Sequence, residues 1–278
     1  MEILSIQDFS ADCKQCFGLC CVALPYAKSA DFAFDKDSGI PCRNLQADYR
    51  CSIHKNLRNK GFRGCTVYEC FGAGQRVSQY TYQGQDWREN QNTAKEMFEV
   101  FPIMQQLFEM LRYLHEAVNY EETQSIHADL KEAIDETKQL TDLPPQSILK
   151  LDVSMHRATI NELLLKTSEL VRAKVNAHKS NKNEIKSRQL IGAKLKGVNL
   201  KGANLRGALL IAADLRDADL TVTDFIGADL RDANVSGADL RGSIFLTQAQ
   251  VNAANGDKKT KLPTSLKVPE HWLCQSNT

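Results

Sequence analysis

The chain has 278 residues, of which 42% are hydrophobic and 25% charged, with 35 Lys and Arg against 34 Asp and Glu. This composition excludes a collagenous or disordered chain and fits a globular protein of about two domains. The net charge of +1 gives no overall field that would attract nucleic acid or an anionic membrane. No segment approaches the ~20 apolar residues of a membrane span. We therefore expect a cytoplasmic protein that recognises its partners through local surfaces.

Eight of the nine cysteines lie within the first 70 residues, in a segment, residues 1–87, with few periodic apolar runs. In a reducing compartment such a cluster holds metal more often than disulfides. Cysteines three positions apart place both sulfurs on one side of a tight turn, which suits tetrahedral zinc or one corner of an iron–sulfur cluster. We therefore expect a metal-binding domain in which metal replaces most of the hydrophobic core. The candidate ligands are Cys13, Cys16, Cys20, Cys21, Cys42, Cys51, Cys65 and Cys70.

The same pattern resembles a family described as zinc- or iron-chelating, in which a CxxC pair is followed by a CC pair and then by separated cysteines. The resemblance covers residues 13–70 and implies zinc or an iron–sulfur cluster as the cofactor. It departs from the family at Phe62-Arg63-Gly64-Cys65, because Arg-Pro often precedes that cysteine in the family. The matching positions are Cys13, Cys16, Cys20, Cys21, Cys42, Cys51 with Ile53-His54, and Cys65.

The spacing leaves the number of metal ions open. Eight thiolates fit two sites of four cysteines, one multinuclear site, or a single structural zinc with the remaining thiols free. Adjacent Cys20 and Cys21 point in different directions on an extended chain, which favours two ions or two metals of one cluster. We expect His54 to lie outside the ligand set, as a hydrogen-bond donor to a thiolate or as a surface residue. The two glycines after Cys70 indicate a turn rather than an anion-binding loop.

Residues 88–186 contain no glycine and carry apolar residues at three- and four-residue steps, which predicts a helical segment. Three amphipathic helices are expected, over residues 104–118, 126–137 and 160–171. Pro102 should begin the first helix or kink a longer one, and Pro144-Pro145 should separate the second helix from the third.

From residue 190 the spacing of bulky residues changes to five, which fits neither a helix nor a strand and therefore indicates an internal repeat. A small residue precedes most of these positions by two, and Asp or Asn commonly stands between. The twelve bulky positions are Leu190, Leu195, Leu200, Leu205, Leu210, Leu215, Leu220, Phe225, Leu230, Val235, Leu240 and Phe245.

This repeat resembles the pentapeptide-repeat family over residues 190–246. The resemblance implies a right-handed quadrilateral β-solenoid with four pentapeptides per coil, so that the twelve units make about three coils. We therefore expect a multidomain α+β chain made of a small Cys-rich metal-binding domain (1–87), a helical middle segment (88–186), the β-solenoid (187–246) and a C-terminal cap and tail (247–278). In the cap, Thr247 and Gln250 predict a capping box, and Gly256 predicts the helix stop.

These features favour a metal-binding regulatory or protein-interaction module that presents the short solenoid as a binding surface. The expected partner is another protein or a second copy of the chain, bound through the solenoid and the helical segment. We expect no contact with a membrane or with nucleic acid.

Two alternatives belong to other functional classes. One is a DNA-mimicking protein that contacts type II topoisomerases, as some pentapeptide-repeat proteins do. Residues 190–246 carry seven Asp against seven Lys and Arg, so they lack the negative charge that such mimicry needs. The other is a metal-dependent or redox enzyme, for which Asp12, His54 and Glu69 are the nearest acid–base candidates. The sequence contains no hydrolase, phosphate-loop or dinucleotide motif, so we favour a non-enzymatic function.

Overall fold

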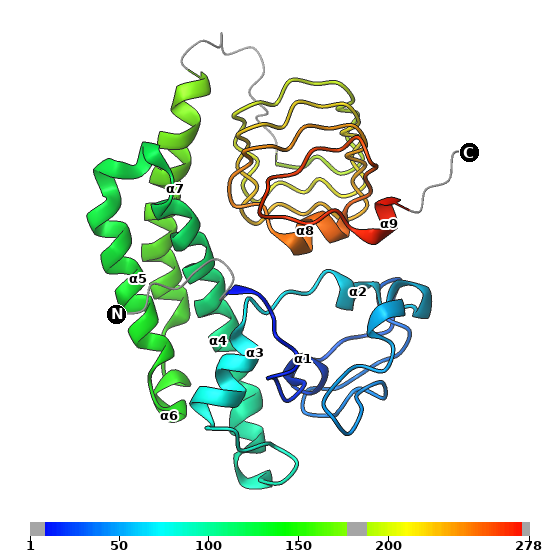
Figure 1. The fold of residues 1–278 in the computed structure, drawn as a ribbon, viewed down its shortest axis with the longest axis vertical. Helices are drawn as coiled ribbons and strands as arrows, with labels where there is room; N and C mark the ends of the chain where they lie inside the picture. Colours follow the sequence, from blue (N-terminus) through cyan, green and yellow to red (C-terminus); the bar gives the residue numbers. More distant parts are fainter. Residues whose placement is uncertain (1–8, 177–187, 274–278) are drawn as a thin grey trace. The chain divides into compact units, whose positions relative to one another are not determined.

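The computed structural model describes residues 9–176 and 188–273. The chain divides into two compact units, Met1–Leu164 and Leu165–Thr278, each of which is described by itself (Figure 1). The first unit contains the cysteine cluster and most of the helices. The second unit contains the repeat and its C-terminal cap.

Short helical turns joined by loops form the cysteine-rich part of the first unit. Two antiparallel bridges, Tyr26–Lys36 and Leu45–Cys51, close the loops between the first two turns. The turns are α1 (Leu19–Val22), the 3₁₀ helices η2 (His54–Asn56) and η3 (Arg58–Lys60), α2 (Arg63–Thr66), α3 (Ala73–Arg76) and the π-helix η4 (Val77–Thr81).

Three long helices follow, as the apolar periodicity predicts, and each is longer than its apolar pattern. Pro102 lies inside the first helix and does not begin it, and Pro145 occupies the first turn of a short helix, where proline is tolerated. The helices are α4 (Gln91–Val118), α5 (His127–Thr141) and α7 (Val153–Asn176), with the 3₁₀ helix η5 (Glu121–Ile126) and α6 (Pro145–Ile148) between them.

The cysteine-rich part packs against α4, which corrects the expectation that metal replaces its hydrophobic core. Met97, Phe101 and Met104 of α4 are at most 1% exposed and form one apolar cluster with Leu19 and Val22 of α1. Burying each large apolar side chain contributes ~1.5–3 kcal/mol. Apolar packing therefore contributes to the stability of this segment. Further members from the same segment are Phe9, Ala23, Phe71, Ala73, Val77, Tyr82 and Trp87.

The second unit contains a stack of coils formed by residues 188–246, called the coil stack below (Figure 1). Parallel bridges join each coil to the next and connect residues twenty positions apart, so one coil takes four of the five-residue units. Within the repeat, the bridged pairs are Gln189–Leu209, Lys194–Asp214, Asn199–Asp219, Asn204–Asp224, Leu209–Asp229, Asp214–Asn234, Asp219–Asp239 and Asp224–Ile244.

The predicted α+β class with a β-solenoid is wrong, because no residue of the two described ranges lies in a β-strand or sheet. All the bridges of the coil stack are isolated. Each five-residue unit has two residues in a turn and one residue in a bridge to the neighbouring coil. The chain changes direction at the turn, so two consecutive residues are never both bridged. A strand needs a ladder of neighbouring pairs. The repeat is therefore a stack of turns joined by single bridges, and the regular secondary structure of the described residues is helical.

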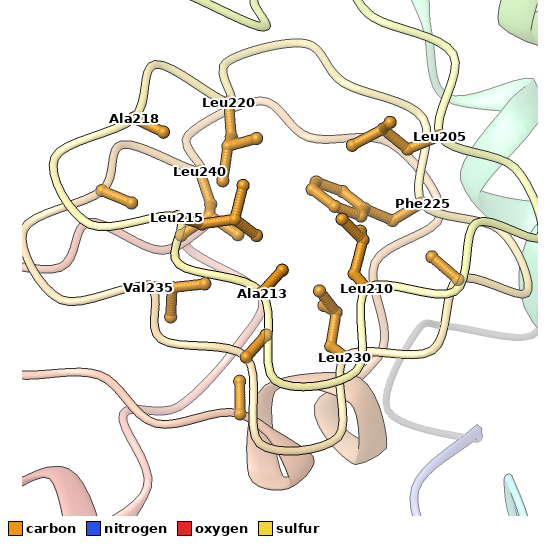
Figure 2. Packing of buried hydrophobic residues seen from close by; sticks show 14 of the residues in the cluster. Leu205, Leu210, Ala213, Leu215, Ala218, Leu220, Phe225, Leu230, Val235 and Leu240 are labelled. Atoms are coloured by element: carbon orange, nitrogen blue, oxygen red, sulfur yellow. The ribbon is translucent and has the colours of Figure 1, made fainter. Parts of the chain in front are cut away.

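Bulky residues of successive units point into the coil stack, as their five-residue register predicts. Leu210, Leu215, Leu220 and Phe225 are fully buried and face a common centre (Figure 2). The small residues, such as Ala218 at 1% exposure, are buried beside them. The core of the coil stack is thus continuous from coil to coil.

Where Asp or Asn precedes a bulky residue, its side chain closes the turn that follows. In eight units of the described repeat its Oδ1 accepts a hydrogen bond from the backbone N–H two residues later, at 2.9–3.2 Å. The residue after that N–H has a positive φ, which glycine adopts most easily. In these eight units it is glycine five times and Asp217, Val222 or Asp232 in the other three.

One ion pair is buried in the coil stack. Asp224 is 0% exposed and Arg206 is 7% exposed, and Arg206 Nη1 lies 3.2 Å from Asp224 Oδ2. By contrast, Asp229 pairs with Arg231 on the surface, where the arginine side chain is half exposed.

The C-terminal end of the coil stack carries a helix, α8 (Gln248–Ala253), with the predicted capping box. Thr247 Oγ1 accepts a hydrogen bond from the backbone N–H of Gln250 at 3.2 Å, and the backbone N–H of Thr247 donates to Gln250 Oε1 at 2.9 Å. Val251 of this helix joins the core of the coil stack.

The predicted glycine stop of this helix is wrong, because α8 ends three residues before Gly256 and Ala254 is already extended. Gly256 instead lies under Trp272 of α9 (Glu270–Leu273), where a Cβ would come within 2.6 Å of the indole. Trp272 is 1% exposed and donates from Nε1 to the carbonyl of Ala254 at 3.0 Å. Glycine is therefore required at this position for packing, not for the helix end.

We expect Ala218→Arg to abolish or strongly reduce soluble protein, because it forces a charge and an oversized side chain into a space filled by a methyl group. Ser236→Arg is the matched control, because Lys196 and Arg216 occupy the same outward position in the two preceding coils. Thermal unfolding of both variants measures the effect. A melting temperature of Ala218→Arg close to that of the control would contradict the assigned register.

We expect Asp224→Asn to lower the free energy of unfolding by about 3 kcal/mol, because it removes the buried carboxylate charge that pairs with the Arg206 guanidinium. Asparagine keeps the oxygen that accepts the turn hydrogen bond. Asp229→Asn, at the equivalent position of a surface pair, should cost less than about 1 kcal/mol. Urea unfolding of the two variants measures both free energies of unfolding. Equal losses of stability in Asp224→Asn and Asp229→Asn would contradict the buried ion pair.

Candidate functional site

Eight cysteines from separate segments of the first unit form the candidate site. All are free thiols, and their exposure ranges from the buried Cys42 to the exposed Cys13 and Cys65. Cys274 lies outside the described residues. The segments are the loop before α1 (Cys13 and Cys16), α1 itself (Cys20 and Cys21), the loops before η2 (Cys42 and Cys51), α2 (Cys65) and the turn before α3 (Cys70).

Cys20 and Cys21 lie side by side in α1, not on an extended chain as predicted. Their sulfurs are 4.0 Å apart. The hydrogen bond between the two thiols raises the pKa of Cys20 well above its usual value and lowers the pKa of Cys21. Nearby Lys36 adds to the lowering at Cys21. Of these two thiols, Cys21 is therefore the more readily deprotonated.

Cys16 and Cys70 lie on either side of Gly74 at the start of α3. A Cβ at Gly74 would lie 2.7 Å from Cys16 Sγ and 3.8 Å from Cys70 Sγ, so this position has no room for a side chain. Burial raises the pKa of Cys16 to about 11. Burial also raises the pKa of Cys70, while the backbone amides of Gly74 and Gly72 lower it by hydrogen bonding. Gly72 thus lies in the predicted turn, Gly74 lies in α3, and both donate amides to a thiol.

Tyr68 places a hydroxyl among the same thiols. Its Oη is buried and has no hydrogen-bond partner within the described part of the chain. Burial raises the pKa of Tyr68, and the neighbouring thiols of Cys20, Cys70 and Cys16 raise it further. An unpaired buried hydroxyl costs free energy, so this donor is available to a sulfur that becomes a thiolate.

Cys42 and Cys21 lie beside a buried lysine and a tyrosine. Tyr26 Oη donates to Cys42 Sγ at 3.2 Å. Lys36 is 6% exposed and donates from Nζ to the carbonyl of Val22 at 3.0 Å. Burial lowers the pKa of Lys36, while the thiols of Cys42 and Cys21 oppose that effect. The site therefore holds one cationic side chain beside its thiols.

Within residues 9–176 and 188–273, no three Cys, His, Asp or Glu side chains converge in the geometry of a metal site. The cysteines are nevertheless close enough to interact electrostatically. Burial raises the pKa values of Cys13 and Cys51. The thiols of Cys70 and Cys21 raise the pKa of Cys13 further, and those of Cys21 and Cys42 raise the pKa of Cys51 further. The structure gathers the predicted ligands in one region without directing them at a common point.

The other acid–base candidates of the sequence have local roles. The carboxylate of Asp12 accepts hydrogen bonds from the backbone N–H of Lys14 and from Gln15 Nε2. His54 is exposed in η2. The carbonyl of Glu69 accepts a hydrogen bond from Gln105 of α4. None of these contacts forms an acid–base pair.

The sequence analysis missed three residues of this region, namely Tyr26, Lys36 and Tyr68. They lie at no fixed spacing from the cysteines, and only the antiparallel bridge Tyr26–Lys36 brings the first two together. Tyr68 stands two positions before Cys70. Its closeness in sequence to a candidate ligand was the one signal that could have identified it.

A second concave site lies between α4, α5 and the start of α7, with a volume of about 310 Å³. Its wall is mostly apolar. The two polar groups of its wall that could act in acid–base chemistry are engaged locally: Asp152 accepts the backbone N–H of Met155, and His156 Nε2 lies 2.9 Å from Thr137 Oγ1. Burial lowers the pKa of His156. This cavity has the character of an apolar gap between helices.

Carboxylates on the surface of the coil stack are paired with arginines two residues later. Arg216, Arg231 and Arg241 each approach the preceding aspartate at 2.6 Å. These pairs neutralise three of the seven carboxylates that a DNA mimic would have to present.

In reduced, metal-free protein at ~pH 8, we expect iodoacetamide to alkylate Cys21 faster than Cys20. This pH lies below the usual thiol pKa of ~8.5, so a lowered pKa leaves a larger thiolate fraction and a raised pKa a smaller one. Timed quenching and peptide mass spectrometry measure both rates. Cys20→Ala removes the hydrogen bond between the two thiols and should slow the reaction at Cys21. Faster alkylation at Cys20 would contradict the assigned order of the two pKa values.

Comparison with known proteins identifies the repeat and a relative of nearly full length. Residues 189–225 and 210–245 match the family of pentapeptide repeats, with eight copies, which confirms the resemblance seen in the sequence. Over 265 residues, 95% of each chain, the sequence is 67% identical to a Bacillus subtilis (strain 168) protein named uncharacterized protein YybG. The resemblance of residues 13–70 to a chelating family stays a prediction. No helix of the described residues is long and apolar enough to span a membrane.

Proposed function

The chain is a pentapeptide-repeat protein of the same family as the Bacillus subtilis protein, and we propose that its coil stack contacts a protein partner. We further propose that its cysteine cluster binds a thiophilic metal. The observation that carries the metal-binding part is the gathering of eight free thiols from separate segments into one region. Zinc or an iron–sulfur cluster is the proposed cofactor, and the proposed ligands are the eight cysteines of residues 13–70.

Two features of the region suit such a group. Tyr68 provides a buried hydroxyl without a partner in the described chain, and this O–H can donate to a metal-bound sulfur. Gly74 leaves the space that Cys16 Sγ occupies, and Cys70 Sγ lies close by. Rotation of the cysteine side chains would be needed to bring four sulfurs around one ion. Bound zinc would link these loops as a structural centre, whereas an iron–sulfur cluster would supply electron transfer.

The coil stack suits the partner-binding part of the proposal because its buried core holds the outward side chains on a fixed frame. Bridges and turn hydrogen bonds set their spacing, and the outward positions are mainly polar. Ile191 is 59% exposed, and Ile211 follows it one coil later. These apolar groups on a polar wall favour contact with another protein.

We expect anaerobically purified full-length protein to contain zinc or iron in at least stoichiometric amount, and Cys16→Ser to release part or all of it. Cys274→Ser is the control and should leave the metal content unchanged. Elemental analysis measures both metals, and brown absorption identifies iron–sulfur while a colourless zinc protein indicates a structural centre. Less than about half an equivalent of zinc plus iron in the unchanged protein would overturn the metal-binding proposal.

We expect Tyr68→Phe to weaken metal binding about tenfold, as loss of a hydrogen bond to a ligand does. Tyr80→Phe removes an exposed hydroxyl from η4 and serves as the control. Competition with a chromophoric chelator gives both affinities. Equal affinities for Tyr68→Phe and the unchanged protein would show that this hydroxyl does not contact the centre.

A further inference from the structure

The two ends of the coil stack differ in what pairs with them. At the C-terminal end, the chain that follows α8 pairs with the last coil through the bridges Asn234–Asn255 and Asp239–Lys261. The first coil, residues 188–207, is bridged within the described residues to the second coil alone, residues 208–227. The far edge of the first coil is therefore an end at which a further chain can be added.

Backbone groups of the first coil lack the partners that their counterparts have in the second coil. The N–H of Asp214 donates to the carbonyl of Ala193 at 2.9 Å, and the carbonyl of Asp214 accepts the N–H of Leu195 at 2.8 Å. Lys194 is the counterpart of Asp214 one coil earlier. Neither its N–H nor its carbonyl has a hydrogen-bond partner in the part of the chain that the structure describes, and the carbonyl of Lys196 has none there either. These groups are available to another backbone.

The backbone beside these groups is accessible. A Cβ at Gly192 or Gly197 would meet no atom within 4 Å. At Gly237, two coils after Gly197, a Cβ would come within 2.4 Å of Asp217 Oδ1 of the preceding coil. The first coil thus has room for an added chain at a position where later coils are in contact with a neighbour.

The same half of the first coil leaves part of its apolar core uncovered. Leu190 and Leu195 are partly buried, whereas Leu210 and Leu215, their counterparts one coil later, are 0% exposed. Ile191 follows Leu190 and is 59% exposed. A chain added at this edge would bury apolar surface as well as pair with the backbone.

The other half of the first coil is buried. Leu200 and Leu205 are at most 2% exposed. Arg172 of α7 donates from Nη1 to the carbonyl of Gly202 at 3.3 Å. The accessible part of the first coil is therefore residues 190–198, called the open edge below.

The first coil carries basic side chains and no carboxylate. Residues 188–207 contain five Lys and Arg and no Asp or Glu. Two of these cations have carboxylate partners in the second coil, Arg206 at 3.2 Å and Lys196 at 4.0 Å. Arg188 and Lys194 are exposed. A partner that carries carboxylates complements this charge.

We propose that the open edge binds an extended, acidic segment of a partner protein, which adds to the first coil as one further layer. The backbone of the segment pairs with Lys194 and Lys196, its apolar side chains cover Leu190 and Leu195, and its carboxylates face the basic side chains. Because the coil changes direction at each turn, the paired stretch is short. This inference rests on the proposed contact with a protein partner and specifies its position and chemistry.

Two other occupants fit the open edge less well. A second copy docked through the same edge would bring two basic first coils together. A nucleic acid has no peptide groups to pair with the backbone, and residues 188–207 contain no aromatic side chain on which a base could stack.

The test uses a fluorescent peptide of four Val-Glu repeats, titrated with full-length protein and followed by anisotropy. We expect this acidic probe to bind at least tenfold more tightly than a peptide of four Val-Lys repeats. N-methylation of either all valines or all glutamates removes the N–H groups along one edge of the peptide. At least one of these two forms should therefore lose at least tenfold in affinity.

A pair of charge reversals locates the site. Lys194→Glu changes the open edge and should weaken binding of the acidic probe at least fivefold. Lys258→Glu is the matched control, because Lys258 is exposed in the C-terminal cap, and should change the affinity less than twofold. Circular dichroism checks that both variants fold, and the peptide comparisons need no variant.

Equal binding of the acidic and basic peptides, full binding of both N-methylated forms, or equal effects of the two charge reversals would overturn the proposal. Tighter binding of a single-stranded oligonucleotide, or a dimer that Lys194→Glu dissociates, would also overturn it. Photo-crosslinking in cells from a benzophenone group at Ile191 or Arg231 separates it from partner binding in general. Protein adducts at Arg231 alone would overturn the open edge, whereas no adduct from any outward position of the coil stack would overturn the proposed partner contact itself.

Discussion

Apolar packing between α4 and the cysteine-rich segment is the interaction on which the arrangement of the thiols depends. Leu19 and Val22 of α1 are fully buried in the cluster formed with α4. Cys20 and Cys21 stand between these two anchors, so their positions follow from the burial of α1. Trp87 extends the same cluster and donates from Nε1 to the carbonyl of Phe17 at 2.9 Å. The scaffold of the site is therefore a hydrophobic core, and a metal would add to that core rather than replace it.

The coil stack solves a different packing problem. Each unit is too short for a strand, so the stack depends on three local devices repeated every five residues: a buried bulky group, one bridge, and a turn closed by Asp or Asn. The unit around Asp224 departs from the others, because its carboxylate closes the turn at Ile226 and pairs with a buried arginine of the preceding coil, Arg206. Asp214, Asp229 and Asp239 also close turns, but each pairs with the arginine two residues later. A buried charge at this position ties two successive coils together by their side chains.

The periodic parts of the chain were predictable, and the non-periodic parts were not. The five-residue register, the three long helices and the capping box at Thr247 each follow from a local rule that acts over a few residues. The β-solenoid was predicted wrongly because the five-residue register shows which residues face inward. It does not show whether enough consecutive residues pair between coils to form strands. The core of residues 1–87 was missed because Phe9, Leu19 and Trp87 are scattered, and only contact with α4 makes them a cluster.

The candidate site shows the same limit. Cysteine spacing predicted which thiols could be ligands, but Tyr26 and Lys36 reach them through a bridge between distant loop residues, and Tyr68 through packing. The role of Gly74 depends on two sulfurs from different segments, so no local pattern could reveal it. Residues that surround a site are set by tertiary contacts, whereas the ligands themselves can be recognised by type and spacing.

Burial also controls how the thiols can bind a cation. It raises the pKa of Cys16 to about 11 and the pKa of Cys70 above its usual value, so both are protonated at neutral pH. Any metal must displace these protons, and the apparent affinity of the site should therefore rise with pH. Cys21 differs because its hydrogen bond with Cys20 lowers its pKa. Of the two neighbours in α1, Cys21 would thus be the more readily deprotonated ligand for a cation.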